Sequence, residues 1–277
     1  NPDESDMPIA VLRYTITNTQ AVPVEVSLAG NLYNAVGYPG TGHFDGKGQG
    51  QNVNAYYDQG NVRGLSMTSN KYETFSRYFG SMALSTTWQD VGYQSYWLRG
   101  PWYDSMHSFW DHFAASGELP AREYGPSDEG KSDVGSLWLR AIIAPGESVT
   151  LPIFISWYMT NFCRYWDALP NIENIELPTE PVWKNYYASL WTDAKDVARH
   201  YAENDVRLDE ETRRFHAALF SSKLPAHVLE AVSSQASTLH TPTVVRLENG
   251  TFYGFEGCCA GGGCCQGSCT HVWNYAQ

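Results

Sequence analysis

The segment 136-SLWLRAIIAPGESVTLPIFISW-157 contains the pattern that decides the fold. Residues 136–143 and 148–157 are rich in Leu, Ile, Val and Trp, the composition of strands that lie on a buried sheet. Between them, 144-APGE-147 places Pro and Gly at positions that suit a tight turn. The segment therefore predicts a β-hairpin.

Two segments near the N-terminus show the strand period of two residues. In 9-IAVLRYTITN-18 and 22-VPVEVSLAG-30, apolar side chains alternate along the chain, and 18-NTQA-21 offers turn residues between them. A further strand is predicted at 80-GSMALSTT-87. The rest of residues 34–135 is rich in Gly, Asn, Ser, Asp, Tyr and Trp, which is typical of long loops on an antiparallel sandwich. Such loops either bind a ligand or cover a sheet edge.

The periodicity changes from strand to helix after 171-NIENIELPTEP-181. Thr179 as cap and Pro181 in the first turn predict a helix start. The apolar positions that follow at spacings of three and four are Trp183, Tyr187, Leu190, Ala194, Val197 and Tyr201. A second helix is predicted from Asp209 and a third from near Pro225. Strands first and helices after favour two domains over an alternating α/β fold.

Composition excludes some classes of partner. The chain has 277 residues and a net charge of −12, with no run of Lys or Arg, so binding to nucleic acid or to an anionic membrane is not expected. The apolar run 153-IFISWYM-159 is too short to cross a bilayer, so no transmembrane segment is expected. Because the sequence opens on Asn1 within a loop-like stretch, the natural start is expected upstream. The compartment stays open for a soluble protein, whether cytoplasmic or extracytoplasmic.

Glu256 is the first candidate for chemistry. It follows the aromatic run 250-GTFYGF-255 and precedes Gly257. A carboxylate that is partly desolvated by neighbouring aromatic rings suits the work of an acid, a base or a nucleophile. The alternative is a surface glutamate on a turn.

Five of the six cysteines lie within residues 258–269. Cys259 and Cys264 are followed by Cys265 and Cys269, with spacings that fit the thiolate ligands of a structural zinc site. Adjacent cysteines fit that pattern poorly, because neighbouring side chains point in different directions. Local disulfides and small buried thiols are the competing interpretations, and all three stay open.

Three segments resemble glycoside hydrolase family 116, the family of the non-lysosomal glucosylceramidase and of microbial β-glucosidases and β-xylosidases. They are 8-PIAVLRYTITNTQAVPVEVSLAGNLYNAVGY-38, 184-KNYYASLWTDAKDVARHY-201 and 250-GTFYGFEGCCAGGGCCQGSCTHVWNYAQ-277. The likeness extends over essentially the whole chain. It implies a fold of mixed class, with an antiparallel β-sandwich at residues 1–170 whose start is missing and a helical linker at 171–222. It also implies that residues 223–277 begin an (α/α)6 catalytic barrel.

The resemblance also implies a mechanism. Family members are retaining glycosidases with two carboxylates about 5–5.5 Å apart, and no cofactor is required. By motif Glu256 matches the nucleophile, whereas the acid/base aspartate lies beyond Gln277, so that residues 1–277 alone are expected to be inactive. His271, Trp273 and Tyr275 are expected to line the sugar pocket. Thr270 and His271 stand where better-characterised branches carry an Asp, which implies a different contact with the sugar.

Two other functions compete with a β-glucosidase-like or glucosylceramidase-like hydrolase. The chain could be an aromatic-rich β-sandwich that binds carbohydrate or a protein partner without catalysis. The cysteine cluster with His271 could also form a small structural metal site. A second carboxylate across the pocket from Glu256 would favour the hydrolase, and bound zinc would favour the metal site.

Overall fold

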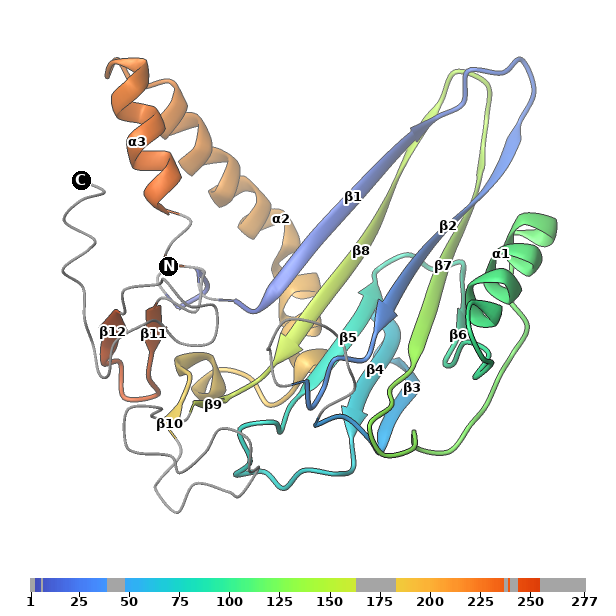
Figure 1. Cartoon of the computed structure of the whole chain (residues 1–277). Coiled ribbons are helices and arrows are strands. Elements are labelled where there is room, and N and C mark those ends of the chain that lie inside the picture. The colour runs from blue at the N-terminus through green and yellow to red at the C-terminus, as the bar shows by residue number, and fades with distance from the viewer. Residues whose placement is uncertain are drawn as a thin grey trace.

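A computed structural model describes residues 3–5, 7–38, 48–162, 183–236, 239 and 244–254. Two antiparallel sheets form the body of the molecule (Figure 1). The larger sheet has the order β1 (Ile9–Thr17), β8 (Ser148–Tyr158), β5 (Ser81–Thr86), β4 (Arg63–Ser69) and β3 (Asn52–Asp58). The smaller sheet has the order β2 (Val24–Tyr33), β7 (Val134–Ile143) and β6 (Val91–Gln94). The predicted antiparallel β domain is thus present, and the long helices follow it in the sequence.

The core lies between the two sheets. On β7 the side chains of Leu137 and Leu139 point into this space, where they meet Leu84 of β5 and Ile153 of β8. All four are buried, and each such side chain stabilises the fold by about 1.5–3 kcal/mol relative to an exposed one. Trp138 lies on the opposite face of β7, as the period of two residues requires.

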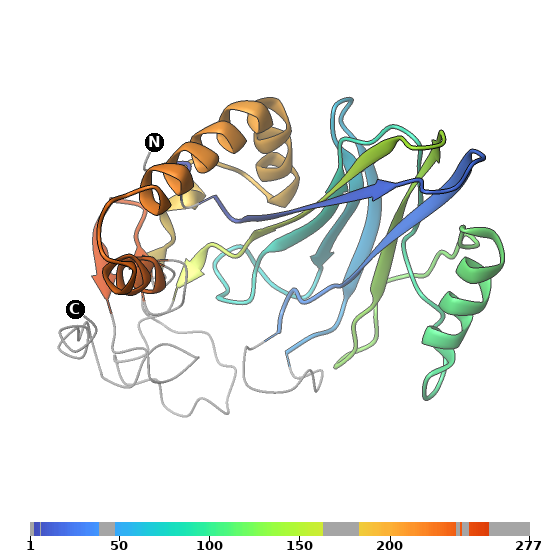
Figure 2. The same ribbon diagram turned by 90° about the horizontal axis from the view of Figure 1, so that it is seen from above.

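A helix covers the outer face of each sheet (Figure 2). α1 (Asp104–Ser116) packs on the smaller sheet, where its buried Phe109 joins Trp138. α2 (Ala194–Phe220) packs on the larger sheet, where Tyr201 meets Phe154 with ring centroids 4.9 Å apart. Helix, sheet, sheet and helix are therefore the four layers of the molecule.

The predicted hairpin over 136–157 is wrong. β7 and β8 lie in different sheets, because β7 pairs with β2 and β6 whereas β8 pairs with β1 and β5. The connections β1–β2 and β7–β8 both cross from one sheet to the other. Asn18 holds the two crossings together: its Nδ2 donates to the carbonyl oxygens of Val22 and Ile143, both at 2.8 Å. The turn residues specify that the chain reverses, and they do not specify which sheet it joins.

The first predicted helix is also wrong over its first described residues; its predicted start at Thr179 and Pro181 lies outside the described part of the chain. Residues 183–190 do not form an α-helix, but the strand β10 (Trp183–Lys184) and the 3-10 helix η1 (Tyr186–Ser189). α2 begins at Ala194 because Asp193 caps it, accepting a 2.8 Å hydrogen bond from the backbone N–H of Asp196.

The second predicted helix is part of α2, which continues through Asp209 without a break. Asp209 does not cap a helix but pairs with Arg13 at 3.0 Å and with Arg213 at 2.8 Å. The third predicted helix is confirmed as α3 (Ala226–Ala236). Of the helices in the described part of the chain, none combines the length and the hydrophobicity that a membrane span needs.

Short strands complete the structure beyond the end of β8. β9 (Asn161–Phe162) pairs with β10, and β11 (Val244–Arg246) pairs with β12 (Phe252–Gly254). These two small sheets lie beside the sandwich, below the arm formed by α2 and α3 in Figure 1. They lead the chain from the β domain to the predicted site.

Candidate functional site

The predicted site residues follow β12 directly in the sequence. Glu256 stands two positions after Gly254, the last residue of β12. The pocket candidates Thr270, His271, Trp273 and Tyr275 and the metal candidates Cys259, Cys264, Cys265 and Cys269 come later. All nine residues lie outside the described part of the chain, so their roles remain predictions. The structure does describe the hairpin that leads to them and the contacts that hold it.

The β11–β12 hairpin is formed by its own turn sequence. Val244, Val245 and Arg246 pair in register with Gly254, Tyr253 and Phe252. Across the turn, the Leu247 N–H donates to the Thr251 carbonyl and the Gly250 N–H donates to the Leu247 carbonyl, both at 2.8 Å. Gly250 adopts φ +84°, a conformation that favours glycine. The dipeptide Asn249-Gly250 is a typical turn signal of a β-hairpin and could have predicted this one.

One face of the hairpin is apolar. Val245 and Leu247 are buried and pack with Trp183 and Tyr253. The rings of Trp183 and Tyr253 lie 5.1 Å apart, a separation within the range of favourable aromatic pairs. Because Trp183 belongs to β10, this cluster joins the hairpin to the segment that precedes α2.

Backbone hydrogen bonds continue this connection to the sandwich. The Glu248 N–H donates to the Lys184 carbonyl at 2.9 Å, and Leu247 forms a β-bridge with Asn185. Asn185 in turn donates its backbone N–H to Thr160 at 2.8 Å and its side-chain Nδ2 to Met159 at 3.0 Å. Met159 and Thr160 directly follow β8. The hairpin is therefore connected by hydrogen bonds to the end of β8 through the short segment of Lys184 and Asn185.

Glu4 ties the N-terminal segment to α2. Arg207 donates from Nη1 and Nη2 to the two carboxylate oxygens at 2.8 and 2.6 Å, and His200 Nε2 lies 3.1 Å from Oε1. The hydrogen bonds from Arg207 lower the pKa of Glu4 to about 2, against burial, which raises it, and with further help from His200. Glu4 is therefore a carboxylate over the whole physiological range and serves as a fixed anchor.

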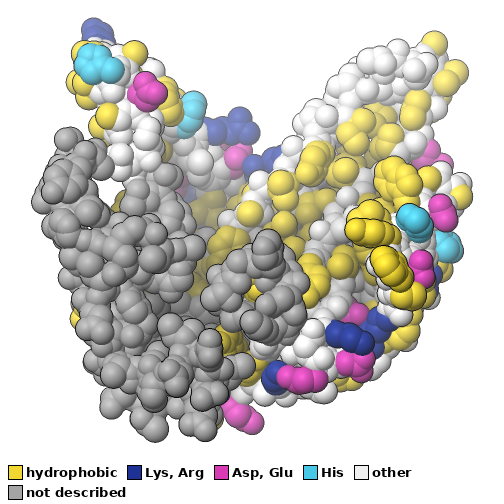
Figure 3. Space-filling model, in the orientation of Figure 1, with side chains coloured by type: hydrophobic (Ala, Val, Ile, Leu, Met, Phe, Trp, Pro, Cys, Tyr) yellow, Lys and Arg dark blue, Asp and Glu magenta, His cyan; other side chains and the backbone are white. Residues whose placement is uncertain are grey.

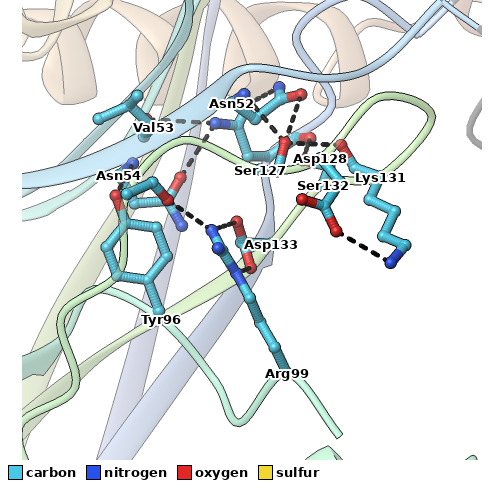
Figure 4. Close-up of polar contacts among 12 residues, drawn as sticks. Asn52, Val53, Asn54, Tyr96, Arg99, Ser127, Asp128, Lys131, Ser132 and Asp133 are labelled. Carbon is cyan, nitrogen blue, oxygen red and sulfur yellow. Dashed lines mark hydrogen bonds and ion pairs between the residues drawn. The ribbon is translucent and has the colours of Figure 1, made fainter. Parts of the chain in front are cut away.

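A second polar cluster lies at the loop end of the sandwich (Figure 4). The buried Asn52 donates from Nδ2 to Asn34 Oδ1 at 3.1 Å and to the Val36 carbonyl at 2.9 Å, and its Oδ1 accepts from Gly50 at 2.9 Å. Asn54 donates from Nδ2 to the Ser95 carbonyl at 2.8 Å. These amides bond to the protein itself and hold the loops on the sheet, so the cluster is structural.

Asp133 and Arg99 close the same end of the sandwich. Arg99 forms a bidentate ion pair with the buried Asp133, with distances of 2.9 and 2.7 Å (Figure 4). Its guanidinium carbon also lies 4.7 Å from the centre of the Tyr124 ring. The hydrogen bonds to Asp133 raise the pKa of Arg99. An arginine that is paired with Asp133 and packed on Tyr124 in this way fixes the loop, so we assign it a structural role.

The described residues contain no group of three or more His, Cys, Asp or Glu side chains that could hold a metal ion. The zinc prediction concerns only the cysteines after residue 257, which lie outside the described residues.

Comparisons with known proteins address the family directly. No curated protein matches the chain. A family model described as beta-glucosidase 2, glycosyl-hydrolase family 116 N-term matches residues 1–208, which is about three quarters of the chain. The match covers both sheets, α1 and most of α2. The chain belongs to glycoside hydrolase family 116 through its N-terminal domain.

Proposed function

We propose that this protein is a retaining β-glycoside hydrolase, related in activity to β-glucosidases and glucosylceramidases, with Glu256 as the nucleophile. Membership of the family carries the proposal, and carbohydrate is accordingly the substrate class. The position of Glu256, two residues after a hairpin that is packed and hydrogen-bonded to the sandwich, supports its assignment. A nucleophile needs such support because productive geometry tolerates displacements of only about 0.5 Å.

The reaction proceeds in two displacements. Glu256 attacks the anomeric carbon, the bond to the leaving oxygen breaks, and an aspartate C-terminal to residue 277 protonates that oxygen. The covalent glycosyl ester is then hydrolysed by water, from which the same aspartate removes a proton. For this the two carboxyl groups must lie about 5–5.5 Å apart. The sugar leaves with the configuration that it had in the substrate.

The residues after Glu256 are proposed to hold the sugar. Trp273 and Tyr275 offer rings for the apolar face of a pyranose, and His271 and Thr270 offer hydrogen-bonding groups for its hydroxyls. The reaction needs no cofactor. We assign no part in it to Cys259, Cys264, Cys265 and Cys269, and a structural zinc ion or disulfides there would only stabilise that segment.

Exposed apolar side chains on the helical arm support the presence of a helical catalytic domain. The C-terminal end of α2 extends away from the sandwich (Figure 1), and large hydrophobic residues on α2, on α3 and between them are exposed. They are Val206, Phe215, Phe220, Leu224 and Val232. A catalytic barrel that begins near residue 223 would bury this surface against its own helices.

Substitution of Glu256 tests the proposal. In the natural polypeptide that contains these residues, Glu256→Gln should lower kcat on an aryl β-glucoside by a factor of the order of 10⁴ or more. Sodium azide should restore turnover of Glu256→Ala, because azide attacks from the face that the carboxylate has vacated and yields an α-glycosyl azide. Retention of more than about a tenth of the activity in Glu256→Gln would refute the assignment.

A second candidate function is carbohydrate binding without catalysis, and the surface of α1 is the observation that favours it. Trp102, Tyr103, Met106 and Trp110 are exposed on and just before this helix, and Trp102 has 93% of its surface accessible. Figure 3 shows the large hydrophobic side chains that gather in this region. If Trp110→Ala abolished retention on immobilised β-glucan while Glu256→Gln changed no hydrolytic rate, binding would be the function.

A further inference from the structure

The hairpin that precedes Glu256 is held on both faces. Val245 and Tyr253 face the apolar cluster with Trp183, and Arg246 therefore lies on the opposite face of β11. The guanidinium carbon of Arg246 lies 3.5 Å from the centre of the Tyr186 ring, a close cation–π contact. Both terminal nitrogens of Arg246 lie 3.4 Å from Oδ1 of Asp3.

A single carboxylate oxygen of Asp3 contacts both Arg246 and Tyr186. The hydroxyl of Tyr186 donates to the same Oδ1 of Asp3 at 3.0 Å. Three segments that are far apart in the sequence therefore meet at one carboxylate: the N-terminal segment, η1 and β11. We refer to Asp3, Tyr186 and Arg246 as the clamp.

The clamp is itself anchored to the body of the molecule. Glu4, the neighbour of Asp3, is bound by Arg207 and His200 of α2. Tyr186 follows Asn185, which is hydrogen-bonded to Met159 and Thr160 after β8. Arg246 is thus linked to α2 through Asp3 and its neighbour Glu4, and to the sandwich through Tyr186 and its neighbour Asn185.

We propose that Asp3, Tyr186 and Arg246 are positioning residues for the nucleophile. This inference rests on the function proposed above. Two residues extend the chain by at most about 7 Å, so the position of Gly254 restricts where Glu256 can reach. β12 is paired with β11, and the clamp fixes β11 from the side that the apolar cluster leaves open. The N-terminal segment thus contributes to the geometry of a catalytic site whose reacting groups come from much later in the sequence.

Kinetics of the natural polypeptide test this role. Arg246→Met keeps the apolar part of the side chain and removes the charge. It should lower kcat about 10- to 100-fold, because a displacement of the nucleophile by about 1 Å costs that much in rate. KM should stay within about twofold, since the clamp does not touch the substrate. Arg246→Lys should recover part of the rate. The matched control is Arg199→Met, which removes an arginine that pairs with Asp196 and Glu203 on the surface of α2 and should leave kcat unchanged.

Hydrogen exchange provides a readout that does not depend on activity. The amide protons of Leu247 and Glu248 are bonded within the hairpin and to Lys184. Their exchange should become at least about tenfold faster in Arg246→Met and in Asp3→Asn, with no further acceleration in the double variant, because both changes break the same contact. Asp3→Asn should also reproduce the loss of kcat.

The outcomes separate the two proposals. If the exchange rates and kcat of Arg246→Met and Asp3→Asn equal those of the wild type while Glu256→Gln is inactive, the clamp is refuted and the nucleophile stands. If exchange accelerates as predicted but the wild type hydrolyses no β-glycoside, the clamp holds the hairpin and its catalytic role is refuted together with the proposed function. A rise in KM with kcat unchanged would also overturn the positioning role.

Discussion

The substitution Glu4→Gln should destabilise the protein in a manner that depends on pH. It keeps the size of the side chain and removes the charge that Arg207 and His200 surround. The hydrogen bonds from Arg207 lower the pKa of Glu4 from its ordinary value of 4.5 to about 2. This difference corresponds to at most about 3–4 kcal/mol of stabilisation of the folded state, at about 1.36 kcal/mol for each pKa unit. Because the Arg207 side chain is 42% exposed, solvent screening reduces the effect, and we expect about 1–2 kcal/mol.

The pH dependence follows from the direction of the shift. A carboxyl group with a lowered pKa in the folded state stabilises the fold above its pKa in the unfolded state, and the stabilisation disappears as the pH falls through the folded-state value. The difference in unfolding free energy between wild type and Glu4→Gln should thus be constant above about pH 4.5. It should then decrease toward zero as the pH approaches 2.

Urea unfolding of both proteins between about pH 7 and pH 2.5 measures this difference. Glu211→Gln is the matched control, because it removes the same charge from a surface pair with Arg207 at 3.3 Å and should cost only a few tenths of a kcal/mol. If the unfolding free energies of wild type and Glu4→Gln differ by less than about 0.3 kcal/mol at neutral pH, the anchoring role of Glu4 is refuted. If this difference in unfolding free energy stayed unchanged down to about pH 2.5, the charge of Glu4 would not be the cause of the stabilisation.

Two further substitutions test the packing of the sandwich. Gly92→Ala would place a Cβ against the indole ring of Trp138, so it should lower the free energy of unfolding by about 1–3 kcal/mol in urea titrations. Gly125→Ala, with open space around it, should be nearly neutral. Asn52→Ala removes the donor to Asn34 and should cost about 1–3 kcal/mol by calorimetry, because it leaves buried polar partners unsatisfied. A neutral result for either variant would contradict the contacts described.

The strands with clear alternation could be predicted from the sequence, and those that bury polar side chains could not. β1, β2, β5, β7 and β8 have the predicted positions within a few residues. β3 was missed because it begins 52-NVN-54, and both asparagines point into a buried network where an apolar residue would have given the usual signal. α1 was missed because its sequence is part of a Gly-, Ser- and aromatic-rich region that is typical of loops.

The spacing of apolar residues before α2 predicts a helix that is not present over residues 183–190. Trp183, Tyr187 and Leu190 have a helical spacing by coincidence, since Trp183 packs with the hairpin and the Tyr187 hydroxyl accepts from the Met159 N–H at 3.1 Å. The local signal that determines the helix start is the cap at Asp193, ten residues after Trp183.

The candidate site could be approached from the sequence only by resemblance. The motif around Glu256 indicated the family, which the match over residues 1–208 then confirmed independently of that motif. The clamp could not be predicted, because Asp3 and Arg246 are 243 residues apart and no periodicity or turn signal connects them. The contact between Asp3 and Arg246 depends on the tertiary arrangement of the small sheets beside the sandwich.

The most direct test of the account is to identify the residue that forms the covalent intermediate. The natural polypeptide would be incubated with an activated 2-deoxy-2-fluoro-β-glucoside, which slows hydrolysis of the glycosyl ester, and the labelled peptide would be located by mass spectrometry. The account predicts one fluoroglucosyl group per active site, attached to Glu256. An adduct on any other carboxylate, or turnover of β-glucosides without an adduct, would contradict it.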